Sequence, residues 1–183
     1  MKIKDVLKEG LSPVLFHATS LKGFDGMMRT NQIKLSRDSA ASNRYYMSFS
    51  RNKANGFIPY LLSLTKGEDE EAFDPRNDAF VVVEFSGVSL GQNYSGAAFN
   101  TFHDPDDDGG ETDHTAPDFM EDRLYNNKPT IPNAKKYIVG LSLITNGIEV
   151  NDKAIVQFIE RYGEKFKYYE STESYTANKQ KSS

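Results

Sequence analysis

The chain contains no cysteine among its 183 residues, so neither a disulfide framework nor a thiolate metal site can form. It also lacks any apolar run approaching the roughly 18 residues that a membrane-spanning helix needs. Its first residues, MKIKDVLKE, are charged and amphipathic and do not contain the apolar core of a signal peptide. These absences favour a cytoplasmic protein without a membrane partner.

Lys and Arg are missing from residues 104–122, a stretch that carries nine acidic side chains. The whole chain has a net charge of −4, but outside this stretch 22 basic residues face 17 acidic ones, a balance of +5. A phosphate-bearing ligand could therefore meet a mildly positive surface. A solvated acidic loop on a neutral domain explains the same numbers equally well.

The length suits one domain with its own hydrophobic core. Apolar residues make up 38% and charged residues 26% of the chain, which is ordinary for a soluble globular protein. We expect a single domain over residues 1–170, followed by a polar, disordered tail over 171–183.

Hydrophobic periodicity and turn residues predict the secondary structure. Helices are expected over 2–9, after an N-cap at Ser20, over 57–64 and after Asp152. Strands are expected at 14–16, 33–35, 45–50, 80–85, 119–125 and 137–144. Strands and helices mix without a regular βαβ alternation, which indicates an α+β fold with a mostly antiparallel sheet.

The segment LFHATS, residues 15–20, places His17 at the end of a buried strand and just before a helix. Ligands often meet backbone N–H groups at such junctions. Taken alone, a histidine in this position is more often a structural residue than a functional one.

The segment YMSFSR, residues 46–51, has an alternating pattern. Tyr46, Ser48 and Ser50 face one way, and the neighbouring face is apolar. Hydroxyls can bond to ribose or to an amide, and Arg51 can hold a diphosphate in a bidentate manner. A solvated strand face would show the same serines without any such function.

Glu121 lies in FMEDRLY, residues 119–125. In a strand, Glu121 and Arg123 would share one side, and Asp122 would lie on the other. One of the two carboxylates would then point to the face where a ligand binds. A surface pair between Glu121 and Arg123 is the simpler explanation when this segment is taken alone.

Together, these segments resemble the ADP-ribosyltransferase superfamily in their order and spacing. That family has a first strand with His or Arg, a middle strand with Tyr or Ser-x-Ser, and a later strand with a catalytic Glu. The matching segments are LFHATSLKGFDGMMRTNQIKLS, YYMSFSRN and MEDRLYNNKPTIPNAKKYI. The resemblance covers roughly residues 13–145 and is greatest to the DarT-like branch and related phage and bacterial proteins. It implies an ADP-ribosyltransferase-like fold, a split and mostly antiparallel sheet with flanking helices.

The resemblance further implies that NAD is the substrate and that its ADP-ribose is transferred. Glu121 would be the catalytic carboxylate, because cleavage of the nicotinamide–ribose bond passes through an oxocarbenium-like state that a nearby negative charge stabilises. His17 would assist by bonding a ribose hydroxyl. The remaining NAD contacts would come from the backbone at Ala18 with Thr19 beside it, from Tyr46 or Tyr45 stacked on nicotinamide, from Ser48 and Ser50 lining the pocket, and from Arg51 at the diphosphate.

The acceptor stays open between protein and nucleic acid. Arginine-modifying family members carry Glu or Gln two residues before the catalytic Glu, and here that residue is Phe119, which argues against arginine. DarT-like relatives modify DNA, yet the acidic 104–118 loop would repel it. A NAD glycohydrolase and a catalytically silent binding module, such as a phage accessory protein in the host cytoplasm, are the alternatives.

The same acidic loop contains a partial calcium motif. Residues 104–109, DPDDDG, match the first half of an EF-hand loop. The twelfth position would be Thr115, where a bidentate Glu is required. We therefore predict no specific metal site.

Overall fold

The computed structural model describes residues 11–37, 44–51, 78–99, 121–150, 153 and 162–177. The helices expected over 2–9 and 57–64, the acidic 104–118 loop, and residues 154–161 of the helix expected after Asp152 lie outside these ranges.

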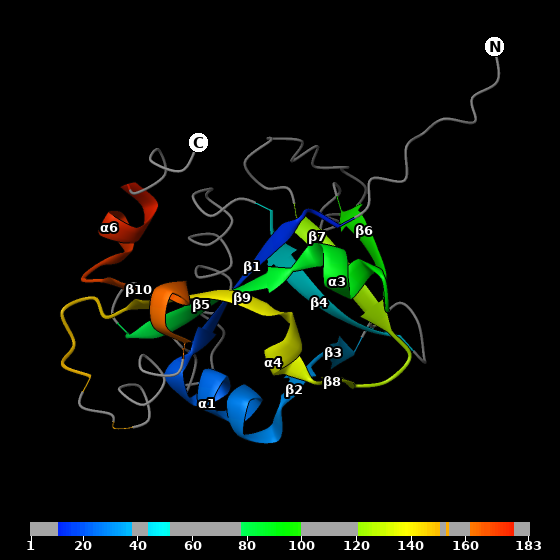
Figure 1. Ribbon diagram of the computed structural model, residues 1–183, viewed down its shortest axis with the longest axis horizontal. Coiled ribbons are helices and arrows are strands. Elements are labelled where there is room, and N and C mark those ends of the chain that lie inside the picture. The colour runs from blue at the N-terminus through cyan, green and yellow to red at the C-terminus, as the bar shows by residue number, and fades with distance from the viewer. Residues whose placement is uncertain are drawn as a thin grey trace, which may run out of the picture.

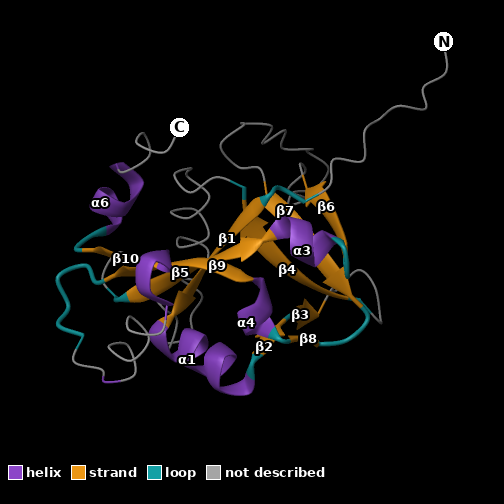
Figure 2. Ribbon diagram, viewed as in Figure 1, coloured by secondary structure: helices purple, strands orange, loops and turns teal. Residues whose placement is uncertain are grey.

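The described residues form an eight-stranded sheet and a separate two-stranded sheet (Figures 1 and 2). The strands are β1 (Val14–Ser20), β2 (Gln32–Lys34), β3 (Ser36–Arg37), β4 (Tyr45–Ser50), β5 (Phe80–Ser86), β6 (Ser95–Phe99), β7 (Glu121–Asn126), β8 (Thr130–Pro132), β9 (Ile138–Ile144) and β10 (Phe166–Tyr169). The helices are α1 (Leu21–Thr30), α3 (Gly87–Gly91), α4 (Ala134–Tyr137), the 3₁₀ turn η2 (Gly163–Lys165) and α6 (Thr172–Ala177).

The large sheet has the order β10-β9-β5-β1-β4-β7-β6, with β3 on β4, and β2 pairs with β8 in the small sheet. Every pair is antiparallel except β10 with β9. The mostly antiparallel mixed architecture predicted from the sequence is therefore confirmed.

The main core lies between one face of the sheet and α1. Ser20 caps this helix by accepting a hydrogen bond from the Gly23 N–H, as predicted, and Phe24, Met27 and Met28 are buried. Alternate residues of β5, which are Val81, Val83 and Phe85, face this core. Their neighbours Phe80 and Val82 are also fully buried, on the opposite face. The β-branched run therefore forms a strand that is covered on both sides.

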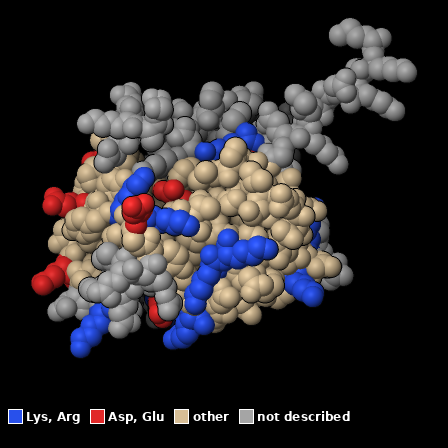
Figure 3. All heavy atoms as spheres, in the orientation of Figure 1, with Lys and Arg blue, Asp and Glu red and all other residues tan. Residues whose placement is uncertain are grey.

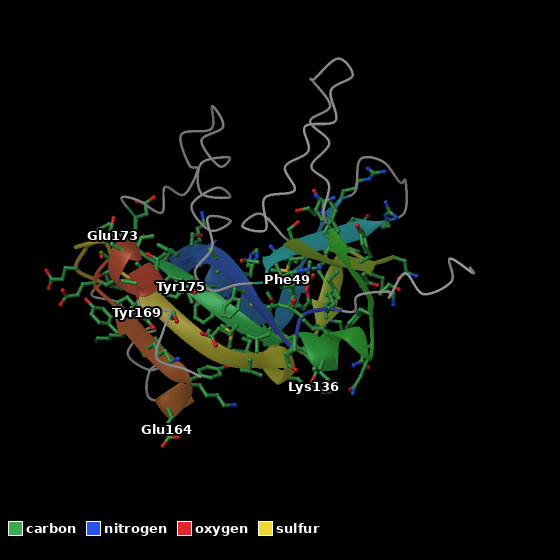
Figure 4. All side chains as sticks on the ribbon, turned by 90° about the horizontal axis from the view of Figure 1, so that it is seen from above. Phe49, Lys136, Glu164, Tyr169, Glu173 and Tyr175 are labelled. Carbon is green, nitrogen blue, oxygen red and sulfur yellow. The ribbon has the colours of Figure 1, made fainter. Side chains whose placement is uncertain are left out.

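A second cluster covers that opposite face and includes part of the 171–183 tail for which disorder was predicted. Residues 172–177 form α6, whose Tyr175 is fully buried and meets the Tyr169 ring edge to face at 5.1 Å between centroids. Figure 4 shows these two rings together where α6 meets β10. Burial of this one aromatic ring anchors a segment in which the only other apolar residue is Ala177.

Two strand boundaries also differ from the sequence prediction. β1 continues to Ser20, so His17 lies in mid-strand rather than at the end of one. Tyr137 belongs to α4 rather than to the strand, and β9 begins at Ile138, opposite Phe85. The short helix turns the Tyr137 ring into the main core.

Candidate functional site

The strands that carry the predicted site residues are neighbours in the sheet. β1, β4 and β7 lie side by side, and the register runs from Phe16 to Ser50 and from Ser50 to Glu121. Adjacent strands are about 4.8 Å apart, so the backbone of Glu121 lies about 10 Å from that of Phe16, beside His17.

β1 and β4 part soon after they meet. β1 pairs with β5 along its whole length, from Val14 to Ser20. With the described part of β4 it pairs at Phe16↔Ser50 alone. Beyond this point the contact is made by a side chain, because Nδ1 of His17 lies 3.3 Å from the carbonyl oxygen of Ser48.

This contact defines the state of the imidazole. A carbonyl oxygen only accepts, so Nδ1 carries the proton and Nε2 is left as an acceptor. Desolvation lowers the pKa of His17 from 6.5 to about 4, against the opposing effect of the hydrogen bond to Ser48. The ring is therefore neutral at pH 7, and its Nε2 can accept a hydrogen bond from a hydroxyl.

Strand alternation separates His17 from the two serines. The His17 ring meets Phe49 edge to face at 6.1 Å on the main-core side of the sheet. Ser48 and Ser50 alternate with Phe49 and lie on the other side, and Ser50 is buried, with 1% of its surface exposed. The hydroxyls of the middle strand and the imidazole therefore share a strand junction but not a face.

The neighbours of His17 on β1 lie in ordered surroundings. Thr19 packs its hydroxyl against the first turn of α1, where a Cβ on Gly23 would come within 2.4 Å of Oγ1. Ala18 packs on the second cluster, with Phe80 and Val82. Both residues are partly exposed.

Arg51 forms an ion pair with Asp122. The sequence predicted which face of its strand Asp122 occupies but indicated no partner for it. The Nε of Arg51 donates to Oδ1 of Asp122 at 2.5 Å, and the two side chains are 17% and 0% exposed. The second carboxylate oxygen, Oδ2, accepts from the Ser12 N–H at 2.6 Å. Asp122 is thus a buried, paired anion, and its strand neighbour Leu124 is also buried.

Tyr46 takes part in a stack of rings and guanidinium groups that the sequence analysis missed. The Arg123 guanidinium lies 4.8 Å from the centroid of Tyr46, and Arg44 lies 4.8 Å from that of Tyr125. Tyr46 and Tyr125 are register partners. The signal was present in the sequence as Arg-x-Tyr on each strand, a spacing that puts both side chains on one face.

A cavity of about 610 Å³ adjoins this stack. It is lined by Arg44, Asn93, Tyr94, Ser95, Tyr125, Asn126 and Asn127. None of these is a predicted site residue, and the cavity lies toward the opposite end of β7 from Glu121.

Within the described ranges, no group of three or more His, Asp and Glu side chains could hold a metal ion. None of the described helices is long and apolar enough to cross a membrane. On the face of the molecule shown in Figure 3, Lys and Arg side chains cover more of the described surface than Asp and Glu do.

Comparison with known proteins finds similarity in structure but not in sequence. No protein-family model matches the chain, and no curated protein matches it. The structure of Thermus sp. 2.9 DarT in complex with NAD⁺ superposes with a TM-score of 0.50 at 9% identity, covering 86% of this chain and 95% of DarT. The carba-NAD⁺ complex of the same protein gives a TM-score of 0.49 at 9% identity, with the same coverage. The chain therefore has a fold similar to that of DarT.

Proposed function

We propose that this protein is a NAD-dependent mono-ADP-ribosyltransferase that acts on a macromolecular acceptor. One observation carries the proposal. The segments with the His, Ser-x-Ser and Glu motifs occupy three adjacent strands of a sheet whose fold resembles that of a protein solved with NAD⁺. Fold likeness alone does not define chemistry, so the motif residues carry the functional part of the proposal.

In this proposal, His17 and Glu121 act on the nicotinamide ribose. The Nε2 of neutral His17 accepts a hydrogen bond from a ribose hydroxyl and so orients the sugar. The Glu121 carboxylate stabilises the positive charge that develops as nicotinamide leaves. The acceptor nucleophile then attacks the anomeric carbon, its proton is lost, and ADP-ribose is joined to the acceptor.

The rest of the proposed NAD site comes from β1 and β4. Ala18 and Thr19 follow His17, and their backbone is the proposed clamp for the nicotinamide amide. Ser48 and Ser50 would shape the pocket wall, whereas Arg51, which the sequence analysis placed at the diphosphate, is bound to Asp122. Tyr46 would stack on nicotinamide through the ring face that Arg123 does not cover.

A catalytically silent module is a second candidate, and two observations favour it. The guanidinium of Arg51 is bound to Asp122, and Glu121 is the register partner of Ser50, so the register position of Glu121 and the hydroxyls of the middle strand belong to the face opposite the His17 ring. A NAD glycohydrolase would share the proposed site and use water as the acceptor.

One experiment separates these candidates. The purified protein is incubated with NAD labelled in its adenine part, together with a panel of proteins, DNA and RNA, and then without any acceptor. Label joined to an acceptor is the expected result for a transferase. Free ADP-ribose in every tube indicates the glycohydrolase, and intact NAD in every tube refutes both enzyme proposals.

A further inference from the structure

One buried carboxylate connects the three chain segments of the candidate site. Asp122 lies on β7 next to Glu121, binds Arg51 directly after the end of β4, and binds Ser12 just before β1. Ser12 is 110 residues and Arg51 is 71 residues from Asp122 in sequence. The carboxylate therefore joins segments that are far apart in the chain.

These contacts lie at the junction between β1 and β4, where the two strands share only one register pair among the described residues. Among the described residues, β1 and β4 share the single register pair Phe16↔Ser50, and Ser50 is the register partner of Glu121. Ser12 precedes β1 and Arg51 follows β4, so both lie beyond this pair at the same end of the two strands. Asp122 therefore joins β1 to β4 at the end where the backbone pairs them, and the strands part at the other end.

The segment before β1 is also held from its other side. The Gly87 N–H donates to the Pro13 carbonyl at 2.9 Å. A Cβ on Gly87 would come within 1.8 Å of the Ser12 carbonyl oxygen. Ser12 and Pro13 therefore have little freedom to move. The hydrogen bond from Ser12 to Asp122 then holds β7 at a fixed position relative to this segment.

We propose that Asp122 is a positioning residue for the NAD reaction, acting through Arg51 and Ser12 to set the distance between the strands that carry His17 and Glu121. The inference rests on the proposed function. In this inference the partner of the Arg51 guanidinium is Asp122 on β7 and not the diphosphate of NAD. A displacement of about 1 Å between reacting groups costs about 100-fold in rate, so a fixed strand separation has a direct kinetic value.

The test is a kinetic double-mutant cycle with Asp122→Asn, Arg51→Gln and the double variant. Both substitutions remove the charge of the side chain and replace the charged group with an amide that can still form hydrogen bonds. We expect each single variant to lose about 10- to 100-fold in kcat per folded molecule, with the KM for NAD within a few-fold of wild type. The double variant is expected to lose no more than the worse single variant, because the residues act as a unit.

Asp25 and Arg29 provide the matched control. They form an exposed ion pair on α1 at 3.7 Å, and the same Asp→Asn and Arg→Gln changes there should leave both kinetic constants unchanged. Melting curves for all variants define the folded fraction at the assay temperature. A role confined to stability would alter that fraction and leave kcat per folded molecule at the wild-type value, which would overturn the proposal.

Two further results would also overturn it. A higher KM for NAD in Arg51→Gln alone would make Arg51 a ligand of NAD, and multiplicative losses in the double variant would make the two residues independent. If the wild type cleaves no NAD, the proposed function fails, and amide hydrogen exchange then tests the strand coupling by itself. Asp122→Asn should speed exchange in β4 and β7 and leave β2 and β8 unchanged, and equal protection in all four strands would refute the coupling.

Discussion

The Nδ1 atom of His17 donates to the carbonyl oxygen of Ser48 at 3.3 Å and so connects β1 to β4 where their backbones no longer pair. The ring is neutral because its position is desolvated, and this effect outweighs the hydrogen bond to Ser48, which favours the charged form. The folded protein holds the pKa of His17 near 4, below its ordinary value of 6.5. Between these values the unfolded chain binds more protons than the folded one.

The stability of the fold should therefore fall as the pH is lowered from 6.5 toward 4. The shift of His17 corresponds to at most about 3 kcal/mol, since each pKa unit is worth about 1.4 kcal/mol. Urea unfolding at pH 7 and pH 4.5 measures the loss, and His17→Gln should reduce it. An equal loss in wild type and variant would show that other groups cause the acid sensitivity.

NAD should raise the melting temperature by an amount that grows with its concentration, because it binds the folded state. His17→Ala removes the proposed ribose contact and should weaken this shift. Lys22→Ala, an exposed change on α1, serves as the control and should keep the full shift. A wild-type protein that shows no shift at millimolar NAD would argue for a domain that does not bind NAD.

Replacing Glu121 should affect turnover much more than binding. Glu121→Gln keeps size and removes the charge that is needed only as the glycosidic bond breaks. We expect a fall of about 100-fold in NAD cleavage, with NAD affinity within a few-fold of wild type. Glu164→Gln, an exposed change in η2, should have no effect on either quantity. Equal activity in both variants would remove Glu121 from the mechanism.

Tyr175→Ala should destabilise the protein by about 3 to 5 kcal/mol, the usual cost of truncating a buried aromatic residue. The neighbouring Tyr168 is 55% exposed, and Tyr168→Ala should cost about 1 kcal/mol or less, including its hydrogen bond to Thr145. Denaturant unfolding compares the two variants. Similar small losses would mean that α6 contributes little to the fold.

Gly87→Ala and Gly26→Ala should change stability in opposite directions. The methyl group at residue 87 would overlap the Ser12 carbonyl, and the forced shift should cost about 1 to 3 kcal/mol or more. Gly26 lies inside α1 with nothing within 4 Å of a Cβ, so alanine there should stabilise by up to about 1 kcal/mol. Thermal melts measure both changes, and a neutral Gly87→Ala would contradict the close approach described above.

The elements predicted from the sequence with most success are those with a clear local pattern. The alternation of β4, the apolar run of β5 and the Ser20 cap of α1 are all present in the structure. Their patterns reflect nearest neighbours along the chain, which the sequence displays directly.

Features that depend on distant partners were not predictable in this way. Asp122 and Arg51 look like ordinary surface charges in the sequence, and only the folded chain brings them together with Ser12. The ordering of α6 likewise depends on a surface for Tyr175 that β5, β9 and β10 form together. The alternation of side chains along β4 was predicted correctly. Which face of β4 lies on the same side of the sheet as His17 depends on how β4 pairs with β1, and the sequence does not show this pairing.

The position of β5 in the sheet has a consequence for how the chain folds. This strand is apolar on both faces, and its neighbours β1 and β9 are distant in sequence, with β9 ending at Ile144. During synthesis, the edge of Phe80–Ser86 that pairs with β9 therefore stays uncovered until the chain has been made as far as Ile144. Non-local pairing of this kind slows folding and leaves a β-prone segment exposed to association with other chains. We expect soluble yield to improve when synthesis is slowed by low temperature.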